Sequence, residues 1–348
     1  MFTIYTTKDN LFRLCSEKEN SWYKVIMKMK KVVVCMDNDE NWNPTNPILQ
    51  NLHKAQVNCS KNNDFINQIV TTNPEKVLDD PSAAYLLDIT NDKAKSIQSK
   101  YGVICQTKDN DNNILIKKGW TIHTEDPSKT QSWNFFFHDY DCPTNSIVII
   151  DRYFFSSEVG ESLDDSLYNL EQILDSLLPK ESPQNIQQVI IIFDFKTFNL
   201  AKDKRENGSD YTFRALAEKI NRIKPKVRKY SFDLELLSIN PDCHRYEDTH
   251  DRRIISNFSI IEAMHKLKVF KTNNTITCGQ SLTFKRLFEE GLDIGAKSTL
   301  PAFLKKNTIK QIQDSIKISR KTMLYACNGH VVEDGNFEIR NRLLIEKK

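Results

Sequence analysis

A histidine and two arginines stand together in EDTHDRRIISNF, residues 247–258, directly after a strand-like run. An imidazole is a good nucleophile at neutral pH, and a cation within reach stabilises the charge that grows on the non-bridging oxygens of a phosphate. His250, Arg252 and Arg253 could therefore act on a phosphate group. The alternative is a surface or subunit contact in which a nearby carboxylate, such as that of Asp251, pairs with these cations.

Positive charge is concentrated in the last third of the chain. Residues 243–348 hold 19 Lys and Arg against 12 Asp and Glu, a net charge of +7, whereas the preceding residues hold 30 against 34, a net charge of −4. A basic segment suggests a phosphate-bearing partner, although a solvated lysine-rich surface gives the same count. A second basic run includes Arg228 and Lys229. We predict both as phosphate contacts, with an ordinary solvated loop as the alternative.

Short apolar strands alternate with helical segments, which predicts an α/β fold. Continuous runs of Val and Ile suit strands that are covered on both faces. We expect strands at residues 31–36, 84–89, 101–105, 146–151, 188–195 and 232–239, and helices at 162–179, 209–223 and 303–321. Ser209 is the expected N-cap of the second helix, and Pro225 is expected to end it. Two consecutive βαβ units indicate a mixed, mostly parallel sheet with flanking helices.

We expect two regions with a soft boundary near residue 140, although the two halves could also share one sheet. Residues 1–140 form an N-terminal α/β region whose role the sequence does not indicate, and residues 141–348 form a domain with a basic C-terminal extension. No apolar run has the length of a membrane span, and the start lacks the layout of a signal peptide. Eight cysteines without a CxxC pair indicate reduced thiols and argue against zinc. We therefore expect a cytoplasmic protein.

Residues 250–257 read H-x-R-x4-N, which resembles the H-x-K-x4-D signature of the phospholipase D-like (PLD-like) superfamily. The run is most similar to the HDR-type variant in the PLD-like C-terminal domain of MIT-domain proteins and their bacterial relatives. The order of elements agrees, since a βαβ unit precedes the motif and SIIEAMHKLKVFK resembles the next strand and turn. The resemblance covers residues 146–290. It implies His250 as a nucleophile that forms a phosphohistidine, Arg252 as the phosphate clamp, and Asn257 at the aspartate position.

Three departures from the family pattern count against catalysis. Asn257 replaces an aspartate, so it brings no negative charge to stabilise an imidazolium. Met264 and His265 replace the small Gly-Ser pair that brings the backbone close to phosphate. No second H-x-K motif occurs in the chain, so an active site would need a homodimer to supply a second copy.

Acidic residues follow several predicted strands, and they offer a different kind of site. Carboxylates at the carboxyl ends of parallel strands can hold Mg²⁺, but aspartate also favours turns. The residues concerned are Asp37, Asp39, Asp88 and Asp151. We predict no metal site and no cofactor, because P-loop, GxGxxG and GxSxG motifs are also absent from the sequence.

The sequence thus favours a module that binds the phosphate backbone of a nucleic acid through a degenerate PLD-like site. An Asn- and Lys-rich composition is typical of an AT-rich genome. The proteins with which such domains are associated suggest a role in a bacterial antiviral defence assembly. One alternative is a metal-independent dimeric phosphodiesterase or nuclease that uses His250. Another is a domain that binds anionic lipids at a membrane surface. We also expect a protein partner to dock on the N-terminal half.

Overall fold

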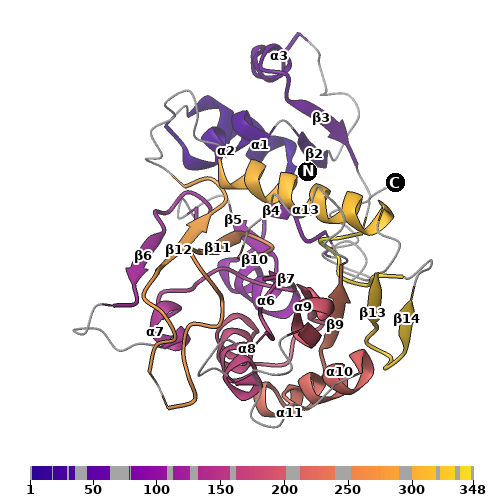
Figure 1. Ribbon diagram of the computed structural model, residues 1–348. Helices are drawn as coiled ribbons and strands as arrows, with labels where there is room; N and C mark the ends of the chain where they lie inside the picture. The colour runs from indigo at the N-terminus through magenta and orange to yellow at the C-terminus, as the bar shows by residue number, and fades with distance from the viewer. Residues whose placement is uncertain are drawn as a thin grey trace.

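Two β-sheets and the helices around them make up the computed structural model (Figure 1). In Figure 1 helices α1, α2 and α3 lie above a long helix, α13, and most of the second sheet lies below it. The described residues are 2–17, 19–29, 31–35, 45–62, 78, 80–107, 113–125, 132–156, 162–200, 212–239, 252–273, 275–289, 300–318, 322–333 and 338–345.

The first sheet pairs its described strands in parallel, in the order β3-β2-β1-β4-β5. Its strands are β1 (Thr3–Thr7), β2 (Lys31–Cys35), β3 (Asn58–Lys61), β4 (Ala83–Leu87) and β5 (Ile104–Thr107). The accompanying helices are α1 (Lys8–Ser16), α2 (Ser21–Met29), α3 (Pro47–Lys54) and α6 (Asn91–Tyr101). Every residue of β4 is buried, because apolar layers cover both faces of the sheet.

The second sheet is mixed and has the order β14-β13-β9-β8-β7-β10-β11-β12-β6 in the described residues. Its strands are β6 (Trp120–His123), β7 (Ser146–Ile150), β8 (Gln188–Phe193), β9 (Asp233–Ser238), β10 (Arg253–Ser256), β11 (Ser259–Ala263), β12 (Ser281–Arg286), β13 (Met323–Tyr325) and β14 (Val331–Glu333). Strands β7, β8 and β9 are parallel, and the remaining pairings are antiparallel. Arg253 of β10 lies opposite Ile150, so the start of β10 adjoins the carboxyl end of β7.

Helices cover both faces of the second sheet. Those that matter here are α7 (Trp133–Phe136), α8 (Leu163–Leu177), α9 (Phe195–Leu200), α10 (Phe213–Asn221), α11 (Lys224–Val227) and α13 (Pro301–Ile318). Alternate residues of a strand point to opposite faces. Ile147 and Ile149 of β7 therefore pack in the core that contains α8 and α10, whereas Val148 and Ile150 pack in the core that contains Ile312 of α13.

The α/β class with flanking helices is confirmed, and both predicted βαβ units are present. Helix α8 lies between β7 and β8, and α10 lies between β8 and β9. The side chain of Ser162 accepts a hydrogen bond from the Asp165 backbone, and the Asp165 carboxylate accepts one from the Ser162 backbone. This capping box fixes the start of α8.

Some predicted boundaries are wrong. The N-cap of α10 is Thr212, whose hydroxyl accepts from the Ala215 backbone at 3.1 Å, and the predicted cap Ser209 lies outside the described residues. Helix α10 ends at Asn221, before the predicted stop, and Pro225 lies in the first turn of α11, because proline tolerates a position whose N–H has no helical partner. Among the described residues the first sheet ends with β5 at Thr107 and the second begins with β6 at Trp120, while the division into two regions near residue 140 stays a prediction.

Gly102 explains why the strand predicted at residues 101–105 begins only at Ile104, as β5. Tyr101 is the last residue of α6, and Gly102 ends the helix in the left-handed region at φ 64°. A Cβ at Gly102 would lie 2.3 Å from the carbonyl oxygen of Thr144, which precedes β7. Only glycine suits both the backbone conformation and this close approach between the two sheets.

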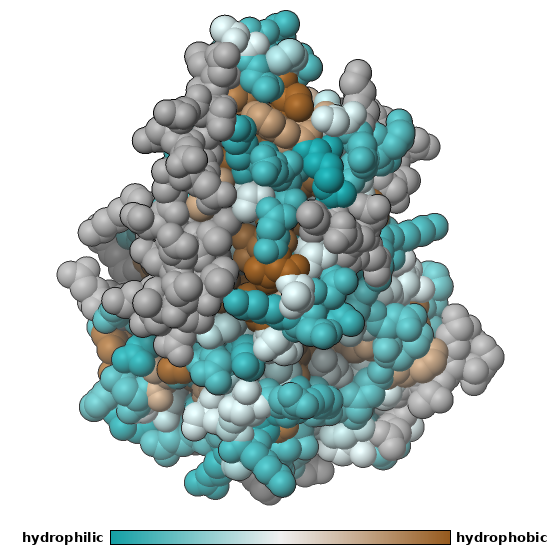
Figure 2. Space-filling model, turned by 180° about the vertical axis from the view of Figure 1, so that it is seen from behind, coloured by the Kyte–Doolittle hydropathy of each residue, from teal (hydrophilic) through white to brown (hydrophobic). Residues whose placement is uncertain are grey.

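The surface seen from behind is mostly hydrophilic where its residues are coloured, with hydrophobic patches near its middle and near its top (Figure 2). Within the described ranges, no helix combines the length and the apolar character that crossing a bilayer requires.

Arg228 holds the end of α8 against the start of β9. Its guanidinium donates to the carbonyl oxygens of Pro179 at 2.6 Å and Leu178 at 2.5 Å, and it pairs with the Asp175 carboxylate. Arg228 is 7% exposed, whereas its neighbour Lys229 is exposed. The arginine thus satisfies carbonyls that the helix itself leaves without donors.

Replacing Arg228 by alanine is expected to lower the free energy of unfolding by about 3 kcal/mol, because buried acceptors lose their donor. Lys229→Ala is the matched control and is expected to change it by less than about 0.5 kcal/mol. Urea unfolding followed by circular dichroism measures both. Equal stability of the two variants would contradict this account of Arg228.

Candidate functional site

The carboxyl ends of the three parallel strands meet at one edge of the second sheet. Asp151 follows β7, Asp194 follows β8, and Ser238 is the last residue of β9. Ligands of open α/β sheets bind outside this edge.

Asp194 is a buried carboxylate whose partners are local. One oxygen accepts from the backbone of Lys196 at 2.9 Å, at the start of α9, and the other accepts from the Thr197 hydroxyl at 2.5 Å. The Arg152 side chain donates to the same carboxylate at 3.2 Å. Asp194 therefore begins a helix and anchors an arginine at the sheet edge.

Asp151 is fully buried and faces two cations. Its carboxylate accepts from the backbones of Leu267 at 2.8 Å and Tyr153 at 3.0 Å. Burial raises the pKa of Asp151, although these two hydrogen bonds and the charges of Arg252 and Lys268 oppose the shift. Arg252, the predicted phosphate clamp, thus lies next to the buried carboxylate of Asp151 at this sheet edge.

The described part of this edge has more cations than carboxylates. Arg152, Arg252 and Lys268 stand near the two aspartates, and the Lys268 ammonium donates to the carbonyl oxygen of Ser156. The guanidinium of Arg152 also lies 5.4 Å from the ring centre of Tyr153, which is 39% exposed. An excess of fixed cations beside an exposed aromatic ring suits an anionic ligand.

Carboxylates do not gather into a metal site in the described residues. No group of three or more His, Cys, Asp or Glu side chains there is arranged to hold a metal ion. Asp88 accepts from the Thr7 hydroxyl at 2.8 Å, and Asp37 and Asp39 lie outside the described ranges.

The two arginines of the motif have different surroundings, and His250 lies outside the described residues. Arg253 donates to Glu262 of β11 at 3.2 Å and to the Thr308 hydroxyl of α13 at 2.8 Å. Burial opposes ionisation of Glu262, but Lys285 and Arg253 outweigh it and hold the pKa of Glu262 below its usual range. Arg253 is therefore committed to the contact between the sheet and α13, and Arg252 is the motif cation at the edge.

Asn257 is fully buried in the turn between β10 and β11. Its side-chain oxygen accepts from the backbones of Asn145 and Ser146, each at 2.9 Å. Its amide nitrogen donates to the Pro81 carbonyl at 2.9 Å and to the Asn145 side-chain oxygen at 2.7 Å. An aspartate here would replace the donating amide nitrogen by an oxygen, which would face the acceptor oxygens of Pro81 and Asn145. This accounts for the amide where the family signature has a carboxylate.

Lys305 of α13 completes this cluster and is a residue that the sequence analysis missed. It is 6% exposed, and its ammonium donates to the backbone oxygen of Asn257. Burial lowers the pKa of Lys305 to about 7, partly opposed by the charge of Asp80. Its sequence context, KK in a basic helix, gave no sign that one lysine points inward and the other outward.

The structure also describes the other predicted phosphate contacts and the two residues that replace the family's Gly-Ser pair. The guanidinium of Arg228 is used by α8, and Lys229 is exposed. Met264 is 65% exposed, and the backbone of His265 donates to the Gln280 side chain at 2.7 Å, so both follow β11 at the surface. Arg152 and Lys268 were not predicted as site residues. The lysine within the apolar run LKVF was the available signal for Lys268.

Asn257→Asp is expected to lower the free energy of unfolding by about 3 kcal/mol, because a buried carboxylate would face two acceptor oxygens. Asn134→Asp is the control, since Asn134 is exposed and only accepts from the Ser176 hydroxyl at 2.8 Å. Urea unfolding at pH 7 measures both variants. Equal stabilities would show that the Asn257 amide does not fix the turn.

Lys305 predicts a pH dependence of stability. Between pH 7 and about 10 the unfolded chain binds a proton at Lys305 that the folded protein lacks, so the free energy of unfolding rises with pH in this window. Below pH 7 both states are charged and the effect levels off. The free energy of unfolding of the wild type is therefore expected to increase relative to that of Lys305→Met from pH 7 to 10. Lys306→Met is the exposed control, and a pH-independent difference for Lys305→Met would refute the buried lysine.

The chain matches no protein-family model and no curated protein. The contacts at the sheet edge and at the β10–β11 turn are therefore the basis for assigning a function.

Proposed function

We propose that the C-terminal half is a degenerate PLD-like domain that binds the phosphate backbone of a nucleic acid in the cytoplasm. The observation that supports this most directly is the position of Arg252, beside the buried Asp151 at the carboxyl edge of β7. Arginine offers phosphate a two-pronged hydrogen bond and keeps its charge at any physiological pH.

The order of elements supports the PLD-like resemblance. Strands β7, β8 and β9 are parallel with helices between them, and the hairpin β10–β11 then pairs beside β7. The PLD-like pattern has the same order, with a βαβ unit followed by a polar turn, the motif and a further strand. The described part of the motif runs from Arg252, at the carboxyl edge of β7, to Asn257 in the buried turn.

Binding is a better match than turnover for the described residues. The Asn257 amide is occupied by Asn145, Ser146 and Pro81, so it has no side-chain atom left to orient a histidine at the far end of the motif. Arg252 can still neutralise the charge of a phosphate, which requires no catalytic step.

A nucleic acid suits the composition of the edge. Phosphate contacts supply affinity without sequence information, and exposed aromatic rings stack on bases. Arg152 and Tyr153 present a cation and a ring side by side, close to the start of β10, which follows Arg252 in the chain. A free inorganic anion would gain nothing from the ring.

Arg252→Glu is expected to weaken binding of a 20-base-pair DNA at least tenfold. The plot of log affinity against log salt is expected to flatten by about 0.9 or more, because one phosphate contact is lost. Fluorescence anisotropy from 50 to 200 mM NaCl measures both quantities. Lys95→Glu, on the exposed side of α6, makes the same charge change and is expected to bind like the wild type.

Two outcomes would count against the proposal. Unchanged affinity of Arg252→Glu would remove Arg252 from the site. Cleavage of the nucleic acid in EDTA that His250→Ala abolishes would establish a metal-independent phosphodiesterase in place of a binding module.

A further inference from the structure

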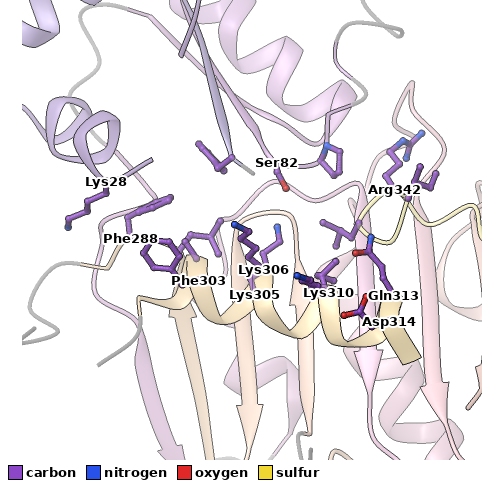
Figure 3. Close-up of a pocket in the computed structure, with 17 residues that line it drawn as sticks. Lys28, Ser82, Phe288, Phe303, Lys305, Lys306, Lys310, Gln313, Asp314 and Arg342 are labelled. Atoms are coloured by element: carbon purple, nitrogen blue, oxygen red, sulfur yellow. The ribbon is translucent and has the colours of Figure 1, made fainter. Parts of the chain in front are cut away.

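A groove runs along α13 on the side that faces the first sheet (Figure 3). Its volume is about 690 Å³, which is within the range of ligand-binding sites. The lining residues of α13 extend from Ala302 to Asp314, a distance of about 18 Å at 1.5 Å per residue. The groove is therefore a trough and not a compact pocket.

Positive charge dominates the lining of this trough. Lys306 and Lys310 are exposed, lie one helical turn apart, and extend from α13 into the groove in Figure 3. Lys28 of α2 and Arg342 add cations from other segments, and Asp314 is the carboxylate among the described lining residues. Among the described residues, none forms a hydrogen bond or an ion pair with the ammonium groups of Lys28, Lys306 or Lys310.

Aromatic and aliphatic side chains form the rest of the lining. Phe303, one turn before Lys306, is 48% exposed although most large apolar residues of the protein are buried. Phe2 and Phe288 lie edge to face with their ring centres 5.6 Å apart and close one side of the groove. A ligand for this lining combines several negative charges with flat apolar groups.

We propose that this groove binds a segment of single-stranded nucleic acid. The inference rests on the proposed function and names a second contact region for the same polyanion, separate from the Arg252 edge. Cations one turn apart along a helix are about 6 Å from each other, which suits successive phosphates of an extended strand. Phe303 and the apolar wall suit unpaired bases, whose faces a duplex keeps stacked on each other. An acidic peptide has the charge but lacks the flat apolar groups.

The test measures binding of fluorescein-labelled 12-nucleotide oligothymidylate and of a 12-base-pair duplex by anisotropy. Lys306→Glu/Lys310→Glu is expected to weaken oligothymidylate binding at least tenfold and to flatten its salt dependence by about 1.4, for two lost contacts. Phe303→Ala is expected to weaken it about tenfold through lost stacking. Lys95→Glu/Lys100→Glu, two exposed lysines of α6, is the charge-matched control, and thermal unfolding verifies that each variant is folded.

The outcomes separate this inference from the proposed function. Wild-type affinity in both groove variants, with a loss in Arg252→Glu, would overturn the groove and leave the sheet-edge site. A loss in the groove variants with normal binding by Arg252→Glu would support the groove and overturn the role of Arg252. Equal competition by polyglutamate, or capture by phosphatidylserine vesicles without oligothymidylate binding, would overturn the choice of a nucleic acid.

Discussion

The buried amide of Asn257 is the constraint on which the arrangement of the two sheets depends. Its oxygen accepts from the residues that begin β7, and its nitrogen donates to Pro81, just before β4 of the first sheet. Its backbone oxygen also accepts from Lys305 of α13. One turn thus joins both sheets and the helix between them, in a site where an unsatisfied polar group would cost more free energy than a hydrogen bond returns.

This constraint divides the motif into two ends with different surroundings. The end at Asn257 is sealed among backbone groups, whereas the end at Arg252 adjoins the carboxyl edge of the parallel strands. The strand between them is only four residues long, and its Arg253 pairs with Glu262 under α13. The groove on the other side of α13 offers a second cationic surface, so the two proposed contact regions flank the same hairpin and helix.

Local patterns predicted the parallel part of the fold well. The continuous apolar run VIIIF in β8 and the capping box of α8 are local sequence patterns, so both elements could be predicted without knowledge of distant segments. The strand β1 (TIYTT) was missed, although it lies at the centre of the first sheet. Its short polar-looking sequence becomes a buried strand only because β2 and β4 pair on either side of it.

By itself the sequence determined the α/β class and both βαβ units. The tertiary structure decided which members of each basic run face solvent. Arg228 is buried and Lys229 is exposed, and Lys305 is buried beside an exposed Lys306, although each pair has nearly the same sequence context. Periodicity gives the direction of a side chain relative to its own helix or strand. Whether that direction meets a carbonyl or water depends on segments far away in the chain, here Pro179 for Arg228 and Asn257 for Lys305.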